Sequence, residues 1–165
     1  MVNKFTSLKT VGSSGFSVKA KPKKAKPKKK TVAQEAECCA VLLQRLVRLK
    51  AADDNGYCTC VTCGIRKHYK EMEGGHYIPR KQTATKLMEE NVHPQCSSCN
   101  GFGMKYGTAN AQYAIYMLDM YGREFVENLL VLAKKTIKWN RFEISALIEH
   151  FKEGIKFHEE RLKGV

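Results

Sequence analysis

Hydrophobic residues recur at helical spacing in two parts of the chain, one on each side of a central stretch that lacks this pattern. The apolar face of the first part is formed by Cys39, Leu42, Leu43, Leu46 and Leu49. Thr31 and Gln34, just before this run, have the spacing of a helix-capping box. The pattern therefore predicts one amphipathic helix that begins after Thr31 and ends near Ala52, before the turn sequence DDNG.

The second helical part begins at Thr108. One apolar face is predicted here from Ala111, Ala114, Ile115, Leu118 and Tyr121. Gly122 is expected to end this helix, and the sequence EFVENLLVLAKK predicts another to about Lys135. A last helix, from about Phe142 to Leu162, has an apolar stripe of Ile144, Leu147, Ile148, Phe151 and Ile155. This stripe could complete the core of a monomer or form a dimer interface.

The central stretch, residues 57–107, is rich in glycine and cysteine and poor in large aliphatic residues. A segment of about 50 residues with so small a core does not stay folded unaided. Two Cys-x-x-Cys pairs, Cys60 with Cys63 and Cys96 with Cys99, can supply four thiolates to one tetrahedral zinc. Such a site has no open coordination position, so this zinc would be structural. Cys58 is a less suitable ligand, because Cys-x-Cys makes a poorer knuckle.

These patterns predict an α+β chain that is mostly helical, with a small zinc-braced centre flanked by helices. The expected segments are a lysine-rich tail over 1–30, a helix and turn over 31–56, the zinc-bound centre over 57–107 and helices over 108–165. No run of about 18 apolar residues indicates a membrane helix, and the N-terminus lacks the apolar core of a signal peptide. We therefore expect a cytoplasmic protein with reduced thiols.

Charge is concentrated at the N-terminus. The formal net charge is +13, and residues 1–30 contain ten lysines and no acidic residue, which leaves +3 for the rest. Such a segment is expected to be disordered and to bind nucleic-acid phosphates without sequence preference; a merely solubilising tail is the alternative. The lysines predicted to contact DNA are Lys23, Lys24, Lys28, Lys29 and Lys30.

The centre also carries residues that a zinc clip does not need. His76 follows two glycines, Asn91 precedes the second cysteine pair, and Asn100 follows its last cysteine. The sequences CVTCG, GGHYIPR and NVHPQCSSCN, in this order, resemble the HNH or ββα-metal nucleases. More closely, they are similar to the phage NinG (Rap) recombination proteins, over about residues 55–160. The resemblance implies a ββα, treble-clef-like centre and a structure-specific endonuclease for branched DNA, such as a Holliday junction or D-loop.

The resemblance also implies roles for these residues. His76 would be the general base that activates water, a task suited to an imidazole near its ordinary pKa of about 6.5. Asn91 would hold the hairpin loop so that His76 is oriented correctly. Asn100 would bind a catalytic Mg²⁺ or Mn²⁺, which would stabilise the charge that develops on the phosphate. His76 as a core histidine, and the asparagines as turn and cap residues, are the alternatives.

One position departs from the HNH pattern. An Asp or His that binds the metal usually precedes the base, and here that position is Gly75. Glu73 and His93 are the candidate replacements, although magnesium prefers oxygen ligands to nitrogen. Arg80, Lys81 and Lys86 could contact phosphates or form an exposed, solvated face.

Two functions therefore remain. The first is the endonuclease, for which a homodimer is favoured because a symmetric junction is generally cut at two sites. The second is a zinc-finger DNA-binding accessory protein of recombination without catalysis, which Gly75 favours.

Overall fold

The structure is a computed structural model that describes residues 29–164. The predicted disorder of the tail therefore falls almost entirely outside the described residues. The same holds for the predicted DNA contacts of Lys23, Lys24 and Lys28. Among the described residues, no helix is both long and apolar enough to cross a membrane.

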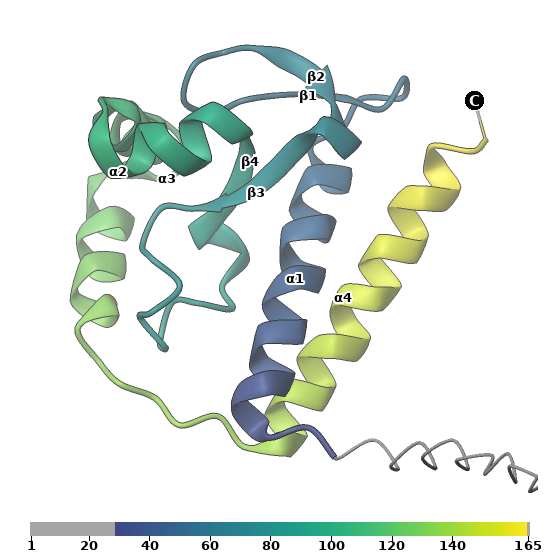
Figure 1. The fold of residues 1–165 in the computed structure, drawn as a ribbon, viewed down its shortest axis with the longest axis vertical. Coiled ribbons are helices and arrows are strands. Elements are labelled where there is room, and N and C mark those ends of the chain that lie inside the picture. Colours follow the sequence, from purple (N-terminus) through teal and green to yellow (C-terminus); the bar gives the residue numbers. More distant parts are fainter. Residues whose placement is uncertain (1–28, 165) are drawn as a thin grey trace, which may run out of the picture.

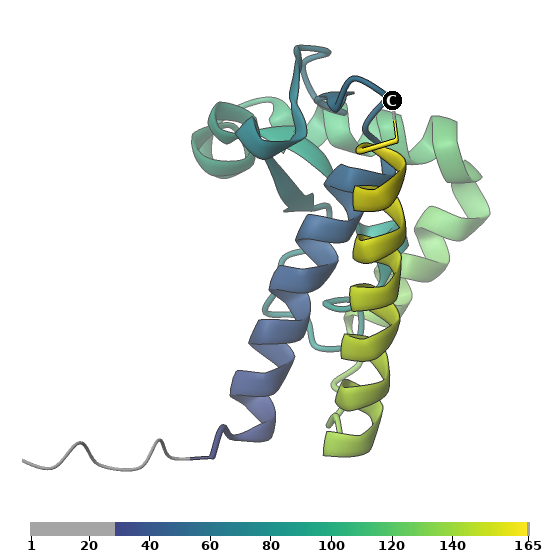
Figure 2. The same cartoon turned by 90° about the vertical axis from the view of Figure 1, so that its right-hand side faces the viewer.

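Two long helices, α1 (Val32–Lys50) and α4 (Arg141–Arg161), run side by side in the same direction (Figures 1 and 2). Both begin with a capping box, at Thr31 as predicted and at Asn140. Arg141 bonds Glu35 near the start of α1, at 2.7 Å. At the other end, Arg161 donates to the carbonyl oxygens of Leu49 and Ala52. These contacts fix the register of the two helices.

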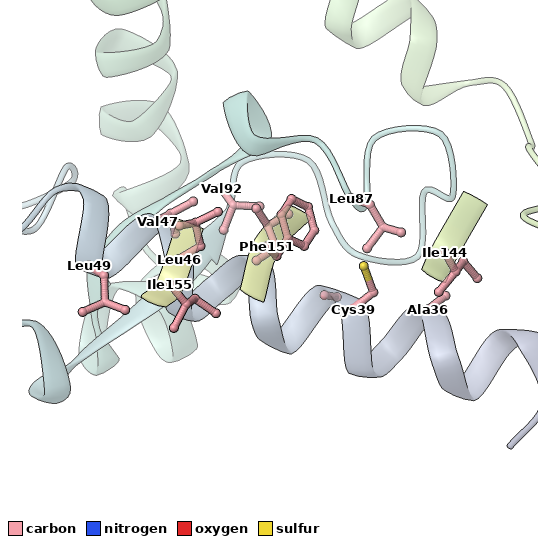
Figure 3. Close-up of a cluster of buried hydrophobic side chains, with 12 residues drawn as sticks. Ala36, Cys39, Leu46, Val47, Leu49, Leu87, Val92, Ile144, Phe151 and Ile155 are labelled. Carbon is pink, nitrogen blue, oxygen red and sulfur yellow. The ribbon is translucent and has the colours of Figure 1, made fainter. Parts of the chain in front are cut away.

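The apolar faces of α1 and α4 form the larger core (Figure 3). Ile144, Phe151 and Ile155 are buried against α1, together with Leu87 and Val92 from the centre of the chain. The stripe predicted on the last helix therefore fills the core of the monomer. These three buried residues are therefore not available for a dimer interface, the other alternative.

Two short antiparallel hairpins form the centre. The first pairs β1 (Tyr57–Thr59) with β2 (Arg66–His68), and the second pairs β3 (Met72–His76) with β4 (Val92–Cys96). Turns of 3₁₀ helix over Tyr69–Glu71 and Glu89–Asn91 precede β3 and β4. The second hairpin packs on α1, and its Gly74 allows a very close approach, because a Cβ there would lie 2.6 Å from Cα of Gln44.

After β4 the chain turns at once into helical structure. A π-helical turn over Cys99–Gly103 leads into α2 (Met104–Tyr106) and then α3 (Ala109–Ala133). Helix α3 is broken at Gly122, whose φ of 78° is a left-handed conformation that favours glycine. The predicted end of a helix at Gly122 is therefore confirmed as a sharp break.

The predicted buried face of α3 is wrong. Ile115 and Leu118 are exposed, whereas Tyr113 and Met117 are completely buried against the centre. The Tyr113 hydroxyl reaches the carbonyl of Gly75 in β3, and Met117 packs in the same cluster as Tyr113, so helix α3 is rotated relative to the prediction. The fold as a whole is the expected mostly helical α+β arrangement with small sheets and a cysteine cluster. The β3–β4 hairpin lies between α1 and α3 (Figure 1).

Candidate functional site

The four predicted cysteines meet in space. The sulfur atoms of Cys60, Cys63, Cys96 and Cys99 all lie within 4.8 Å of one another. The Sγ atoms of Cys63 and Cys96 are 3.8 Å apart, which is about the separation of two sulfurs bound to one tetrahedral zinc at about 2.3 Å. The cluster could therefore hold a metal such as zinc.

Two loops bring the sulfurs together. Cys60 and Cys63 lie in the turn that joins β1 to β2, where Cys60 N–H donates to the carbonyl of Ile65 and Gly64 N–H to that of Cys60. Cys96 ends β4, and Cys99 begins the π-helical turn. Burial acts to raise the pKa of Cys96, but hydrogen bonds from Ser98 and Cys99 outweigh it and lower the pKa to about 6, whereas the pKa of the neighbouring Cys99 is raised, chiefly by burial. A low pKa favours the thiolate, which is the form that binds metal.

Cys58 is not part of this cluster. It is buried beside Met72, and burial raises the pKa of its thiol. Its side chain therefore behaves as a small hydrophobic group of the core. This agrees with the prediction, from the Cys-x-Cys spacing, that Cys58 is not a metal ligand.

His76, the predicted base, ends strand β3 and lines a cleft of about 330 Å³. Its Nε2 lies 3.0 Å from the carbonyl oxygen of Lys86. A carbonyl can only accept a hydrogen bond, so Nε2 carries the proton and Nδ1 of the neutral ring is left as a proton acceptor. Burial lowers the pKa of His76 to about 4, below the ordinary value expected for it, so the ring is neutral at pH 7.

Asn91 braces the loop that joins β3 to β4. Its side chain is fully buried and makes three hydrogen bonds to backbone. The Oδ1 atom accepts from the N–H of Ile78 at 2.8 Å, and Nδ2 donates to the carbonyls of Ile78 and Thr85 at 3.0 Å each. These bonds fix both ends of the loop that carries Lys86, the partner of His76.

Asn100 lines the same cleft as His76. Its Nδ2 donates to Oε2 of Glu73 at 2.5 Å. Glu73, one of the two candidate replacements for Gly75, therefore lies next to Asn100. A Cβ at Gly75 would overlap Oε1 of Gln95 and lie 2.9 Å from Oδ1 of Asn100. There is thus no room for a metal-binding side chain at position 75 while Gln95 occupies that space.

His93, the other candidate replacement, has no free nitrogen. Its Nδ1 lies 2.9 Å from the hydroxyl of Tyr113, and its Nε2 lies 2.9 Å from that of Tyr121. The ring also packs edge-on against Tyr113 and Tyr116. Since both ring nitrogens are used within the core, His93 as a metal ligand is not supported by this geometry.

The predicted phosphate contacts in the centre differ in their surroundings. Lys86 is only 8% exposed and its ammonium group pairs with Glu37 of α1, so its prediction as a DNA contact is corrected to a structural ion pair. Arg80 lines the cleft and also pairs with Glu37, at 2.5 Å. Lys81 is exposed in the same loop, and Lys29 and Lys30 are exposed before α1.

Two exposed aromatic residues that follow Asn100 in the chain were missed by the sequence reasoning. The rings of Phe102 and Tyr106 are 5.0 Å apart and are 72% and 65% exposed. The ammonium group of Lys105 lies 4.8 Å from the centre of the Tyr106 ring. Their spacing of four residues, directly after Asn100, was the available signal.

Comparison with known proteins identifies a family that covers this region of the chain. The family described as Bacteriophage Lambda NinG protein matches residues 12–161. No curated protein and no solved structure gives a significant match. The match covers most of the chain, including the cysteine cluster, His76, Asn91 and Asn100. This chain therefore belongs to the NinG family.

Proposed function

We propose that this protein is a metal-dependent endonuclease that cuts branched DNA during phage recombination. The cysteine cluster holds a structural zinc, and the cleft beside it is the active site. The centre has the order of an HNH nuclease: the β3–β4 hairpin is followed by a helical turn, with His76 on the first strand and Asn100 on the turn.

The observation that carries the proposal is the state of His76. Its Nε2–H is held by the Lys86 carbonyl, which fixes the tautomer and leaves Nδ1 as the proton acceptor. Burial lowers its pKa to about 4, so the ring is neutral but is a weaker base than an ordinary imidazole. His76 lines a cleft that Asn100 also lines, and Nδ1 is the ring atom that carries no proton.

The chemistry follows from this arrangement. His76 Nδ1 accepts a proton from a water molecule, whose oxygen forms a bond to phosphorus while the bond to the leaving oxygen breaks. Asn91 keeps the loop of Lys86 in place, so that the His76 ring keeps its orientation. A bound magnesium or manganese ion supplies charge stabilisation for the phosphate and the leaving oxygen.

The preference for branched DNA is supported by Phe102 and Tyr106. Exposed aromatic rings stack on unpaired bases, each worth about 1–3 kcal/mol, and Lys105 beside Tyr106 adds a positive charge for the backbone. Bases are unpaired or easily unstacked at a branch point but not in a continuous duplex. The lysines of the N-terminal segment add binding to phosphates without sequence preference.

Cleavage at two symmetric strands favours a homodimer. Because Ile144, Phe151 and Ile155 of α4 are buried, we assign this contact to the exposed apolar residues of α3, which include Ile115 and Leu118. Light scattering on the purified protein measures this directly, and Leu118→Arg is expected to convert a dimer to a monomer.

The second candidate is a DNA-binding accessory protein that does not cut. Gly75, which supplies no metal ligand, is the feature that favours it. A four-way DNA junction and a linear duplex of the same sequence, each with magnesium, manganese or EDTA, separate the two functions. The nuclease cuts the junction with a divalent metal and not with EDTA; tight binding to the junction without cutting under any metal would establish the accessory protein.

A further inference from the structure

Gln95 is a buried side chain with an unused oxygen. It is completely buried in β4, opposite Glu73 in the hairpin. Its Nε2 donates to Oγ1 of Thr62 at 2.5 Å. Its Oε1 has no hydrogen-bond partner in the part of the chain that the structure describes. A buried carbonyl oxygen without a partner is unfavourable and rare, so its position calls for an explanation.

This oxygen points into the space beside Gly75. A side chain at position 75 would begin where Gln95 Oε1 now lies, and 2.9 Å from Asn100 Oδ1. Two amide oxygens, from Gln95 and Asn100, therefore converge on the place that the metal-binding side chain of a common HNH nuclease would take. The amide nitrogen of Asn100 is held by the Glu73 carboxylate at 2.5 Å, which leaves its oxygen free.

We propose that Gln95 is the ligand that Gly75 cannot supply. In this arrangement one divalent cation binds between Gln95 Oε1 and Asn100 Oδ1, with the carboxylate of Glu73 as the charged neighbour. Carboxylate and amide oxygens are the donors that Mg²⁺ and Mn²⁺ accept in proteins. The use of this cation in cleavage rests on the function proposed above, whereas its binding does not.

A hydrogen bond ties this ligand to the loop of the first cysteine pair. Thr62 lies between Cys60 and Cys63, and Gln95 directly precedes Cys96. The Thr62 hydroxyl accepts from the nitrogen of the Gln95 amide, and the oxygen of the same amide lies beside Gly75. A residue that supports a metal ligand in this way typically changes metal affinity about 10–100-fold when it is lost.

The test is Mn²⁺ binding to the zinc-loaded full-length protein, followed by electron paramagnetic resonance. Gln95→Ala is expected to weaken Mn²⁺ binding at least about tenfold, with unchanged zinc content and circular dichroism. Gln95→Glu keeps an oxygen donor and can still accept from the Thr62 hydroxyl, so it should bind Mn²⁺ at least as tightly as the wild type. Gln112→Ala, an exposed glutamine of α3, is the matched control and should change nothing.

A ligand exchange between strands makes the test sharper. Gly75→Asp alone should disrupt the site, because its Cβ would collide with Gln95. Combined with Gln95→Ala, the same aspartate has room and an oxygen to offer, and the double variant should bind Mn²⁺ again. This reversal is not expected if Gln95 only fills space. In that case Gln95→Ala alone would already bind Mn²⁺ like the wild type, and the double variant would have no lost binding to recover.

Two outcomes would overturn the inference: Gln95→Ala that binds Mn²⁺ like the wild type, or Gln95→Glu that binds it more weakly. Neither affects the proposed function if the wild type cuts branched DNA. Conversely, Mn²⁺ binding that depends on Gln95, in a protein that cuts no DNA, would contradict the proposed function and leave the cation site standing.

Discussion

His93 and Tyr113 are joined by a hydrogen bond between Nδ1 and the phenolic oxygen, at 2.9 Å. The Tyr113 hydroxyl donates in turn to the carbonyl of Gly75, at 2.9 Å, so its oxygen is the acceptor and His93 Nδ1 carries the proton. Nε2 of the neutral ring then accepts from Tyr121. This chain of bonds ties α3 to the strand residue that precedes His76, and it requires a neutral imidazole.

The need for a neutral His93 predicts a loss of stability in acid. Burial lowers its folded-state pKa to about 4, against about 6.5 when unfolded. The stabilisation is therefore complete above about pH 6.5 and is lost as the pH falls toward 4, because only the unfolded chain takes up the proton. We expect a loss of about 2 kcal/mol from this residue between about pH 7 and pH 5.

Urea unfolding of the wild type and of His93→Gln at both pH values measures this contribution. The variant keeps polar contacts to the tyrosines but does not titrate, so its stability should depend less on pH. Zinc content is measured at each pH, since acid also releases zinc from thiolates. An identical pH dependence in both proteins at equal zinc content would contradict the assignment.

The cysteine cluster predicts that metal removal unfolds the centre. Apparent binding energies of about 10–16 kcal/mol for structural zinc match or exceed the usual stability of a domain. Cys96→Ser should therefore lose zinc and most near-ultraviolet circular dichroism, whereas the α1–α4 pair retains helical signal. Cys38→Ser, which lies on α1 outside the cluster, should keep one zinc per chain; a zinc-free wild type with an intact fold would show that the cluster is not a metal site.

Asn91 predicts a coupled loss of stability and activity. Asn91→Ala leaves one N–H and two carbonyls of the buried loop without partners, which should cost about 2–5 kcal/mol. Because the same loop carries the Lys86 carbonyl, the His76 ring loses its support as well. Denaturant unfolding and DNA cleavage are measured together, with the exposed Asn128→Ala as control. Cleavage at the full rate in a destabilised Asn91→Ala protein would show that the loop held by Asn91 is not needed for catalysis.

The aromatic pair predicts a change in substrate preference. Phe102→Ala with Tyr106→Ala should weaken binding to a four-way junction by about 2 kcal/mol or more, because two stacking surfaces are lost. Binding to a linear duplex should change much less. Fluorescence anisotropy on both DNAs measures the ratio, and Phe142→Ala, an aromatic residue 83% exposed at the start of α4, is the control. An equal loss on both DNAs would assign the pair to general binding.

Features of this chain that depend on local spacing could be predicted from the sequence. The capping box of Thr31 and Gln34, the break at Gly122 and the meeting of the two cysteine pairs each follow from residues a few positions apart, or from a metal geometry that fixes their distance. The resemblance to NinG proteins also rested on such short motifs, and the family match agrees with it.

Features that depend on how distant elements meet could not be predicted. Lys86 lies beside Glu37 of α1, and Tyr113 and Met117 of α3 are buried in a cluster with Ile78, which follows β3. The role of Gln95 could not be predicted for the same reason. Its unpaired oxygen is recognised only when the fold places Gly75 and Asn100 around it. No pattern in the sequence distinguishes it from an ordinary strand residue.

The most direct test of the central claim is cleavage of a four-way junction under single-turnover conditions by the wild type, His76→Ala and His150→Ala. The account predicts metal-dependent cutting that falls by about 10²–10⁴-fold in His76→Ala, with junction binding and zinc content unchanged. His150, which is exposed on α4, should be dispensable. Cutting by His76→Ala at the wild-type rate, or no cutting by the wild type with any divalent metal, would contradict the account.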